Sequence, residues 1–234
     1  MRILIGILIF PLLLHADAES LFHQATVHYN EGNFQKALEA YQDIEAVSPE
    51  LDYNIANTLM KLDRPAEAIA RYRRAQWLKP GDADIQANLK LAVEQADAPL
   101  PEIPLLRSLT GWWTPATWQR IFILTCWLTA GLGFLTTVIP RVRALAFWTV
   151  PPMLLLLGCA AVGTWASLPS NFTSEAVIKS PEAITRFEPL PDATEKRNVS
   201  RGTLVTVLGT ERNWIRIQTD EDTGWIKEEE LVRL

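Results

Sequence analysis

The pattern of hydrophobic and polar positions divides the chain into segments of different character. An apolar stretch, Ile3–Leu14, precedes residues 19–98, where apolar positions recur with helical periodicity. Two runs without a charge, Ile121–Ile139 and Ala144–Leu168, are each long enough to cross a hydrocarbon core of about 30 Å as a helix. From residue 169 the pattern changes to short alternating strands. The sequence therefore predicts a multidomain membrane protein with an all-α region, two transmembrane helices and a small all-β barrel.

The N-terminus is typical of an export signal. Met1 and Arg2 supply a positive start, and after the apolar stretch Ala16 and Ala18 have the spacing of a cleavage site. Residues 1–18 are therefore predicted to be a signal peptide that exports the region that follows. The alternative is that this segment stays in place as an uncleaved anchor.

The loop between the two apolar runs predicts their orientation. Arg141 and Arg143 are the only charged residues across both runs and the loop that joins them. Short, positively charged loops remain in the cytoplasm. We therefore expect residues 121–168 to form a transmembrane hairpin in the bacterial inner membrane, with 99–120 as a linker and both soluble domains on the periplasmic side. A buried hairpin in a soluble protein is disfavoured because neither run has a polar face.

The helical region contains two similar segments, Gly32–Pro49 and Asp63–Pro80. Aligned at a constant spacing, they match Ala37 with Ala68, Leu38 with Ile69, Tyr41 with Tyr72 and Pro49 with Pro80. Small residues let paired helices approach closely, and proline ends a helix. Residues 19–98 thus resemble a tetratricopeptide repeat domain, although the spacing is slightly shorter than the usual period of about 34 residues. Ala83–Gln95 is expected to be a capping helix.

The resemblance implies that the first helix of each pair lines a concave groove. The implied partner-binding residues are Phe22, Tyr29, Tyr53, Asn54, Asn57 and Lys61. The alternative is that these are ordinary exposed positions of a helical array. Arg71, Arg73 and Arg74 lie on a second helix and are expected to be solvated surface.

The C-terminal segment has the strand pattern of a small barrel. Three runs, Leu204–Gly209, Asn213–Thr219 and Thr223–Val232, are separated by turn-forming residues, and an earlier strand is expected within Ala176–Ile184. The motif positions are Gly202, Val205, Val207, Trp214, Gly224, Trp225 and Ile226. They resemble a bacterial SH3-like domain over residues 169–234, which is expected to fold alone. Such domains bind cell-wall peptides or protein segments, so Trp214 and Trp225 are either partner-binding or core residues.

The order of these segments resembles the BatE-type proteins of the Bacteroides aerotolerance (Bat) group. Tyr53–Ala92 carries most of the resemblance, although Ala56 and Asp63 stand where such repeats usually have glycine. The resemblance implies von Willebrand A-domain membrane proteins and a MoxR-type ATPase system as partners. It also implies a role in envelope or oxidative-stress tolerance.

Composition and candidate chemistry argue against catalysis and nucleic-acid binding. The net charge of −5 lacks the basic surplus of a nucleic-acid-binding protein. Cys126 and Cys159 lie inside the apolar runs, and His23 and His28 would point to different sides of a helix. We therefore expect no catalytic, metal or cofactor site. The sequence predicts a membrane-tethered periplasmic adaptor; the alternative is a peptidoglycan-binding protein that acts through the SH3-like domain.

Overall fold

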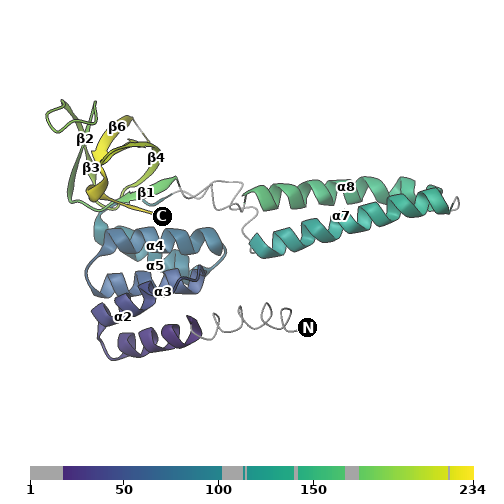
Figure 1. Cartoon of the computed structure of the whole chain (residues 1–234), viewed down its shortest axis with the longest axis horizontal. Coiled ribbons are helices and arrows are strands. Elements are labelled where there is room, and N and C mark those ends of the chain that lie inside the picture. Colours follow the sequence, from purple (N-terminus) through teal and green to yellow (C-terminus); the bar gives the residue numbers. More distant parts are fainter. Residues whose placement is uncertain (1–17, 102–112, 114, 140–141, 167–173, 221) are drawn as a thin grey trace, which may run out of the picture. The chain divides into compact units, whose positions relative to one another are not determined.

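The computed structural model describes residues 18–101, 113, 115–139, 142–166, 174–220 and 222–234 (Figure 1). The predicted signal peptide, apart from Ala18, and most of the predicted linker lie outside these residues. Contacts between residues divide the chain into two compact units. One unit comprises the N-terminal helices and the C-terminal sheet, and the other comprises the two long apolar helices.

The N-terminal region is helical, as predicted. A first helical run covers residues 18–30, and α2 (Phe34–Gln42), α3 (Pro49–Lys61), α4 (Pro65–Leu78) and α5 (Ala83–Ala96) follow. Ser48 caps α3 by accepting a hydrogen bond from the Leu51 amide at 3.0 Å, and Pro49 occupies the first turn, where no backbone donor is needed. Asp82 caps α5 in the same way.

The residues matched between the two repeat-like segments form the core of the helical region. Ala37 and Ala68 are completely buried, and Tyr41 and Tyr72 are each 2% exposed. Ala56, which stands at a usual glycine position, is also completely buried. The small side chains and the tyrosines of the matched positions therefore belong to one packed core.

The C-terminal region is a seven-stranded antiparallel sheet with the strand order β3-β2-β6-β5-β4-β1-β7. Its strands are β1 (Glu175–Ile178), β2 (Glu182–Arg186), β3 (Glu195–Ser200), β4 (Leu204–Glu211), β5 (Trp214–Gln218), β6 (Thr223–Lys227) and β7 (Leu231–Arg233). A short 3-10 turn, Glu228–Glu230, separates the last two strands. The single strand expected within Ala176–Ile184 is in fact two strands, because Ser180 and Pro181 form a turn between them.

The core of the sheet follows the predicted alternation from Ile215 onward, although Trp214 before it is also buried. Ile215 and Ile217 on β5 are completely buried, while Arg216 and Gln218 between and after them are exposed. Ile226 on β6 belongs to the same buried cluster. Period-two burial of this kind is what a half-covered strand requires.

The sheet also contacts the helical region within the same unit. Val177 on β1 is completely buried and belongs to the core cluster of the helices. Arg73 on α4 is 3% exposed and forms an ion pair with Glu175 on β1. The expectation that Arg73 is solvated surface is therefore wrong. Arg71 and Arg74 are half-buried, and both form ion pairs with the fully buried Asp52 on α3.

The second unit consists of two helices that pack side by side, α7 (Pro115–Val138) and α8 (Val142–Ala166) (Figure 1). Within the described residues, Ala116–Val138 is the one helix long and apolar enough to cross a membrane, and α8 contributes a shorter apolar stretch, Thr149–Trp165. One of the two predicted spans is thus supported as a candidate, and the second stays a prediction. Pro151 and Pro152 lie inside α8.

Candidate functional site

A network of amides and hydroxyls connects three helices of the N-terminal region. Asn88 on α5 donates from Nδ2 to the Tyr53 hydroxyl at 2.7 Å and to Asn57 Oδ1 at 3.4 Å. The Tyr72 hydroxyl on α4 also donates to Asn57 Oδ1. Burial raises the pKa of Tyr72, with smaller contributions from Tyr53 and Tyr29, so this hydroxyl remains a protonated donor at neutral pH.

The network changes the role expected for Asn57. Its amide oxygen accepts hydrogen bonds from both Tyr72 and Asn88, so it connects α3 to α4 and α5. Tyr53 packs edge-on against Tyr72, with ring centroids 5.9 Å apart, and belongs to the same arrangement. Asn57 therefore positions helices, and the half-buried Tyr53 lies beside it with part of its surface open.

The two aromatic residues predicted nearest the N-terminus are held in a similar way. Phe22 packs edge-on against Tyr41 at 5.5 Å between ring centroids, and Tyr29 packs edge-on against Phe34 at 5.4 Å. Phe22 and Tyr29 are half-buried. Burial, with smaller contributions from Tyr41 and Tyr53, raises the pKa of Tyr29. Both rings thus combine a packing role with partial exposure, as expected along the inner face of paired helices.

Asn54 and Lys61 are the remaining predicted groove residues, and both lie on α3. Asn54 is half-buried, and its carbonyl accepts a hydrogen bond from Thr58 Oγ1 at 2.7 Å. Lys61 is exposed in the last turn, where a positive charge favours the negative end of the helix. Of the predicted set, the structure brings Tyr53 and Asn57 together and adds Asn88, which the sequence analysis missed because α5 was predicted only as a cap.

The two predicted tryptophans of the sheet differ in burial. Trp214, at the start of β5, is 8% exposed and counts among the buried core. Trp225 on β6 is half-buried and lies opposite Arg186 of β2 in the sheet. Trp225 is therefore the one of the two with more surface for a ligand.

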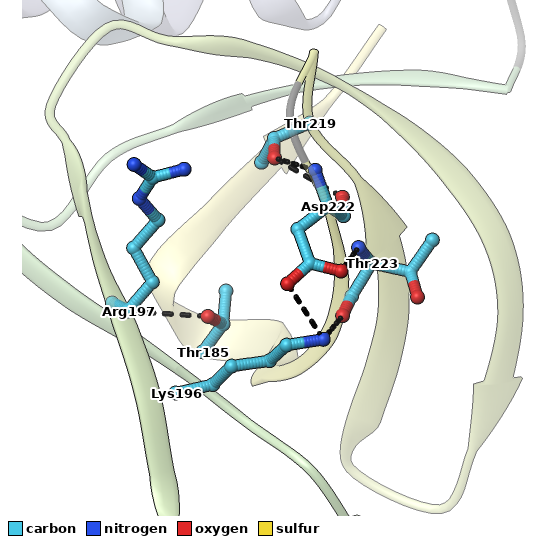
Figure 2. Close-up of polar contacts among 6 residues, drawn as sticks. All are labelled: Thr185, Lys196, Arg197, Thr219, Asp222 and Thr223. Carbon is cyan, nitrogen blue, oxygen red and sulfur yellow. Dashed lines mark hydrogen bonds and ion pairs between the residues drawn. The ribbon is translucent and has the colours of Figure 1, made fainter.

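A polar network fixes the turn between β5 and β6 to β3 (Figure 2). Lys196 on β3 donates from Nζ to the Thr223 carbonyl at 2.7 Å and forms an ion pair with Asp222 Oδ2 at 2.8 Å. The Asp222 amide donates to Thr219 Oγ1 at 3.2 Å, and the Thr223 amide donates to Asp222 Oδ1 at 2.7 Å. The hydrogen bond from Lys196 first, and then the one from the Thr223 amide, lower the pKa of the Asp222 carboxyl.

An open depression of about 540 Å³ lies at the loop between β2 and β3. It is lined by Phe187, Glu188, Leu190, Pro191, Asp192, Ala193 and Thr194. Phe187 is 58% exposed and Leu190 51% exposed, and the Lys196 ammonium lies 4.9 Å from the centroid of the Phe187 ring. Arg186 donates to the Ala193 carbonyl at 2.6 Å and holds the loop in place. The sequence analysis missed this surface because its proline-rich stretch lacks strand alternation.

Comparison with known proteins assigns the C-terminal sheet to a domain family. Residues 179–232 match the family described as Bacterial SH3 domain. The match runs from the end of β1 to β7 and includes Trp214, Trp225 and the depression beside β2 and β3. A search of curated proteins found no match to the chain. The expected SH3-like domain is therefore confirmed, and the resemblance of the remaining segments stays a prediction.

Proposed function

We propose that this protein is a membrane-tethered periplasmic adaptor, which assembles envelope or stress-tolerance proteins through its helical repeats and its SH3 domain. The observation that carries the proposal is a bacterial SH3 domain joined to a helical region in the same chain. SH3 domains of bacteria bind peptidoglycan or protein segments. The half-buried aromatic and amide side chains of the helical region supply a second surface of the kind that holds a peptide backbone.

Contacts between the two modules support a membrane hairpin between them. Arg73 and Glu175 lie on opposite sides of the apolar helices in the sequence, yet they pair directly at 3.1 Å. Modules in contact lie on the same side of a membrane, so the segment between them crosses an even number of times. One crossing by α7 therefore requires a second by α8. Arg141 and Arg143, at the connection between these helices, favour the cytoplasm for that end.

The partners that we propose are proteins. The resemblance to BatE-type proteins suggests von Willebrand A-domain membrane proteins and a MoxR-type ATPase system as the first to examine. Lys61, exposed at the end of α3, favours a partner segment that carries a carboxylate. A non-enzymatic role is part of this proposal, with neither a cofactor nor a metal.

The adaptor role is tested by replacing Lys61, because Asn57 connects helices and its loss would disturb the fold. Tagged full-length protein is purified from gently solubilised bacterial membranes, and co-purifying proteins are quantified by mass spectrometry. Lys61→Glu is expected to reduce recovery of the bound partners about tenfold or more, because it reverses the charge at the groove. Lys36→Glu, an equal charge change at an exposed position of α2, should leave recovery unchanged. Equal recovery with both variants would contradict a partner site at this face.

Peptidoglycan binding is the second candidate, and the depression beside Phe187 favours it. Exposed aromatic and aliphatic side chains next to the Glu188 and Asp192 carboxylates suit a ligand with both apolar and amine groups. Full-length protein in mild detergent is sedimented with purified sacculi. Sedimentation that is lost in Phe187→Ser would support cell-wall binding, whereas protein that stays in the supernatant favours the adaptor role.

A further inference from the structure

A carboxylate of the SH3 domain is held by three donors from α4. Arg73 donates from Nε to Glu175 Oε2 at 3.1 Å and from Nη2 to Glu175 Oε1 at 3.4 Å. The Trp77 indole nitrogen donates to Glu175 Oε2 at 3.3 Å. Arg73 is 3% exposed and Glu175 is 14% exposed. This is a forked, charge-assisted contact removed from water, which restricts the geometry of its two partners more than a surface ion pair does.

The guanidinium of Arg73 is held in place from the helical side as well. Its Nη1 donates to Gln76 Oε1 at 2.9 Å, and its central carbon lies 5.7 Å from the centroid of the Trp77 ring. Gln76 and Trp77 are themselves buried. The helical region thus presents a preorganised cation, and a buried cation is costly unless a carboxylate meets it.

Apolar contacts also join the two modules. Leu204, Val232 and Leu234 of the SH3 domain pack against the core cluster of the helices. At the turn between β3 and β4, a Cβ atom on Gly202 would lie 2.8 Å from the Cβ of Ala98 and 2.9 Å from that of Ala96. The turn therefore lies in close contact with the end of α5. Val177 of the sheet is part of the helical core cluster, while the sheet keeps a buried cluster of its own.

We infer that the SH3 domain docks, within its own chain, onto the end of the helical region. The Arg73–Glu175 pair fixes how the two modules align. The two residues are 102 positions apart in the sequence, with the apolar helices between them, and we expect the two modules to unfold as one cooperative unit. The α4–α5 face is an interaction surface whose partner is this chain's own SH3 domain. Docking occupies the β1 and β7 side, which leaves the β2–β3 side with Phe187 for ligands. This inference does not depend on the proposed function.

The test compares two isosteric substitutions in full-length protein held in detergent micelles. Glu175→Gln removes the buried carboxylate, and Glu228→Gln removes the exposed carboxylate that pairs with Arg233 at 2.9 Å in the same domain. Hydrogen exchange is followed by mass spectrometry in peptides from β4–β6 and from α3–α4. Glu175→Gln should lower protection about a hundredfold or more, by the same factor in both modules, because it removes the carboxylate charge that offsets the buried Arg73 guanidinium. Glu228→Gln should change protection less than about fivefold.

Any one of three outcomes would overturn the inference. Loss of protection in the SH3 strands alone would show that the modules unfold separately, and equal behaviour of Glu175→Gln and Glu228→Gln would show that the pair does not fix how the modules align. A third variant covers the case in which Glu175→Gln fails to fold. Arg73→Met combined with Glu175→Met replaces both charges by apolar groups and should recover protection in both modules. A double variant no better than Glu175→Gln would also contradict the inference.

Discussion

At the scale of single residues, Asp63 shows how a departure from the repeat pattern is tolerated. It follows α3 with φ at 56°, in the left-handed region that favours glycine. The next amide, on Arg64, donates to the Leu59 carbonyl at 3.0 Å, and the Asp63 amide donates to the Met60 carbonyl at 3.2 Å, which closes the helix end. Aspartate visits this conformation at a moderate cost, and Gln95 donates a hydrogen bond to its carboxylate at 2.8 Å.

Asp63→Gly is expected to stabilise the protein by about 1 kcal/mol, because it removes the left-handed strain at this helix end. The free energy of unfolding is measured by urea titration of full-length protein in mild detergent. Asp63→Ala serves as the comparison and should be less stable than the parent protein. A loss of stability in Asp63→Gly would mean that the exposed hydrogen bond with Gln95 outweighs the strain.

Gly202 gives the opposite case, a glycine whose replacement is expected to destabilise the protein. Its φ is 83°, and an added Cβ would overlap Ala96 and Ala98 on the helical side. Gly202→Ala should therefore cost about 2 kcal/mol or more, from backbone strain and overpacking together. Gly209 on β4 is the matched control, since a Cβ there would meet no atom within 4 Å. Equal stability of the two variants in thermal unfolding would contradict the close approach of this turn to α5.

At the scale of elements, the turn between β5 and β6 is held by a titratable pair. The Lys196 hydrogen bond, with the Thr223 amide second, lowers the pKa of Asp222 from its ordinary value of 3.8. A carboxyl with a lowered pKa in the folded state stabilises the turn above its ordinary pKa, and that contribution is lost as the pH falls through the lowered value.

Replacing the lysine should therefore change the titration of this turn. In an NMR titration of Asp222, Lys196→Met is expected to move the midpoint upward towards 3.8, because the largest cause of the shift is gone. Lys227, on β6, is an exposed lysine that pairs with Glu229. Lys227→Met should leave the Asp222 midpoint unchanged. An Asp222 midpoint that does not respond to Lys196→Met would mean that the ion pair in Figure 2 is absent in solution.

The elements predicted best from sequence are those with a local signal. Helices α3 and α5 each follow a residue that caps them with its side chain, and β5 alternates from Ile215 onward. Each element is therefore indicated by a few neighbouring residues. Strand β3 has no such signal, because its sequence is almost entirely polar and only Val199 is buried. It pairs with β2 through the backbone, which a hydrophobic pattern cannot indicate.

The contacts that the sequence could not predict are those between distant segments. Arg73 is a charged residue of the kind expected at an exposed helix position, and its burial depends on a contact with Glu175, far along the chain. Asn88 likewise acquires its role from Tyr53 and Asn57 on another helix. Of the predicted groove, the residue types and the helix were accessible from sequence, whereas the hydrogen bonds that occupy Asn57 were not.

At the scale of the whole molecule, the proposed function depends on how the apolar helices cross the membrane. The helical region and the SH3 domain meet through a largely buried ion pair and apolar contacts, although the apolar helices separate them in the sequence. If α7 and α8 cross the bacterial inner membrane as a hairpin, the arginines at their connection lie in the cytoplasm and both binding modules lie in the periplasm. An adaptor then presents two surfaces to the same compartment.

The most direct test of this account is the accessibility of single cysteines in intact cells. Cys126 and Cys159 are replaced by serine, and one cysteine is introduced at Asn30, Asn213 or Val142. After permeabilisation of the outer membrane, a membrane-impermeant thiol reagent should label Asn30→Cys and Asn213→Cys, which are exposed positions of the two modules. Val142→Cys, at the start of α8, should react only once the inner membrane is lysed. Labelling of Val142→Cys in intact cells, or of only one of the two module positions, would contradict a hairpin with both modules in the periplasm.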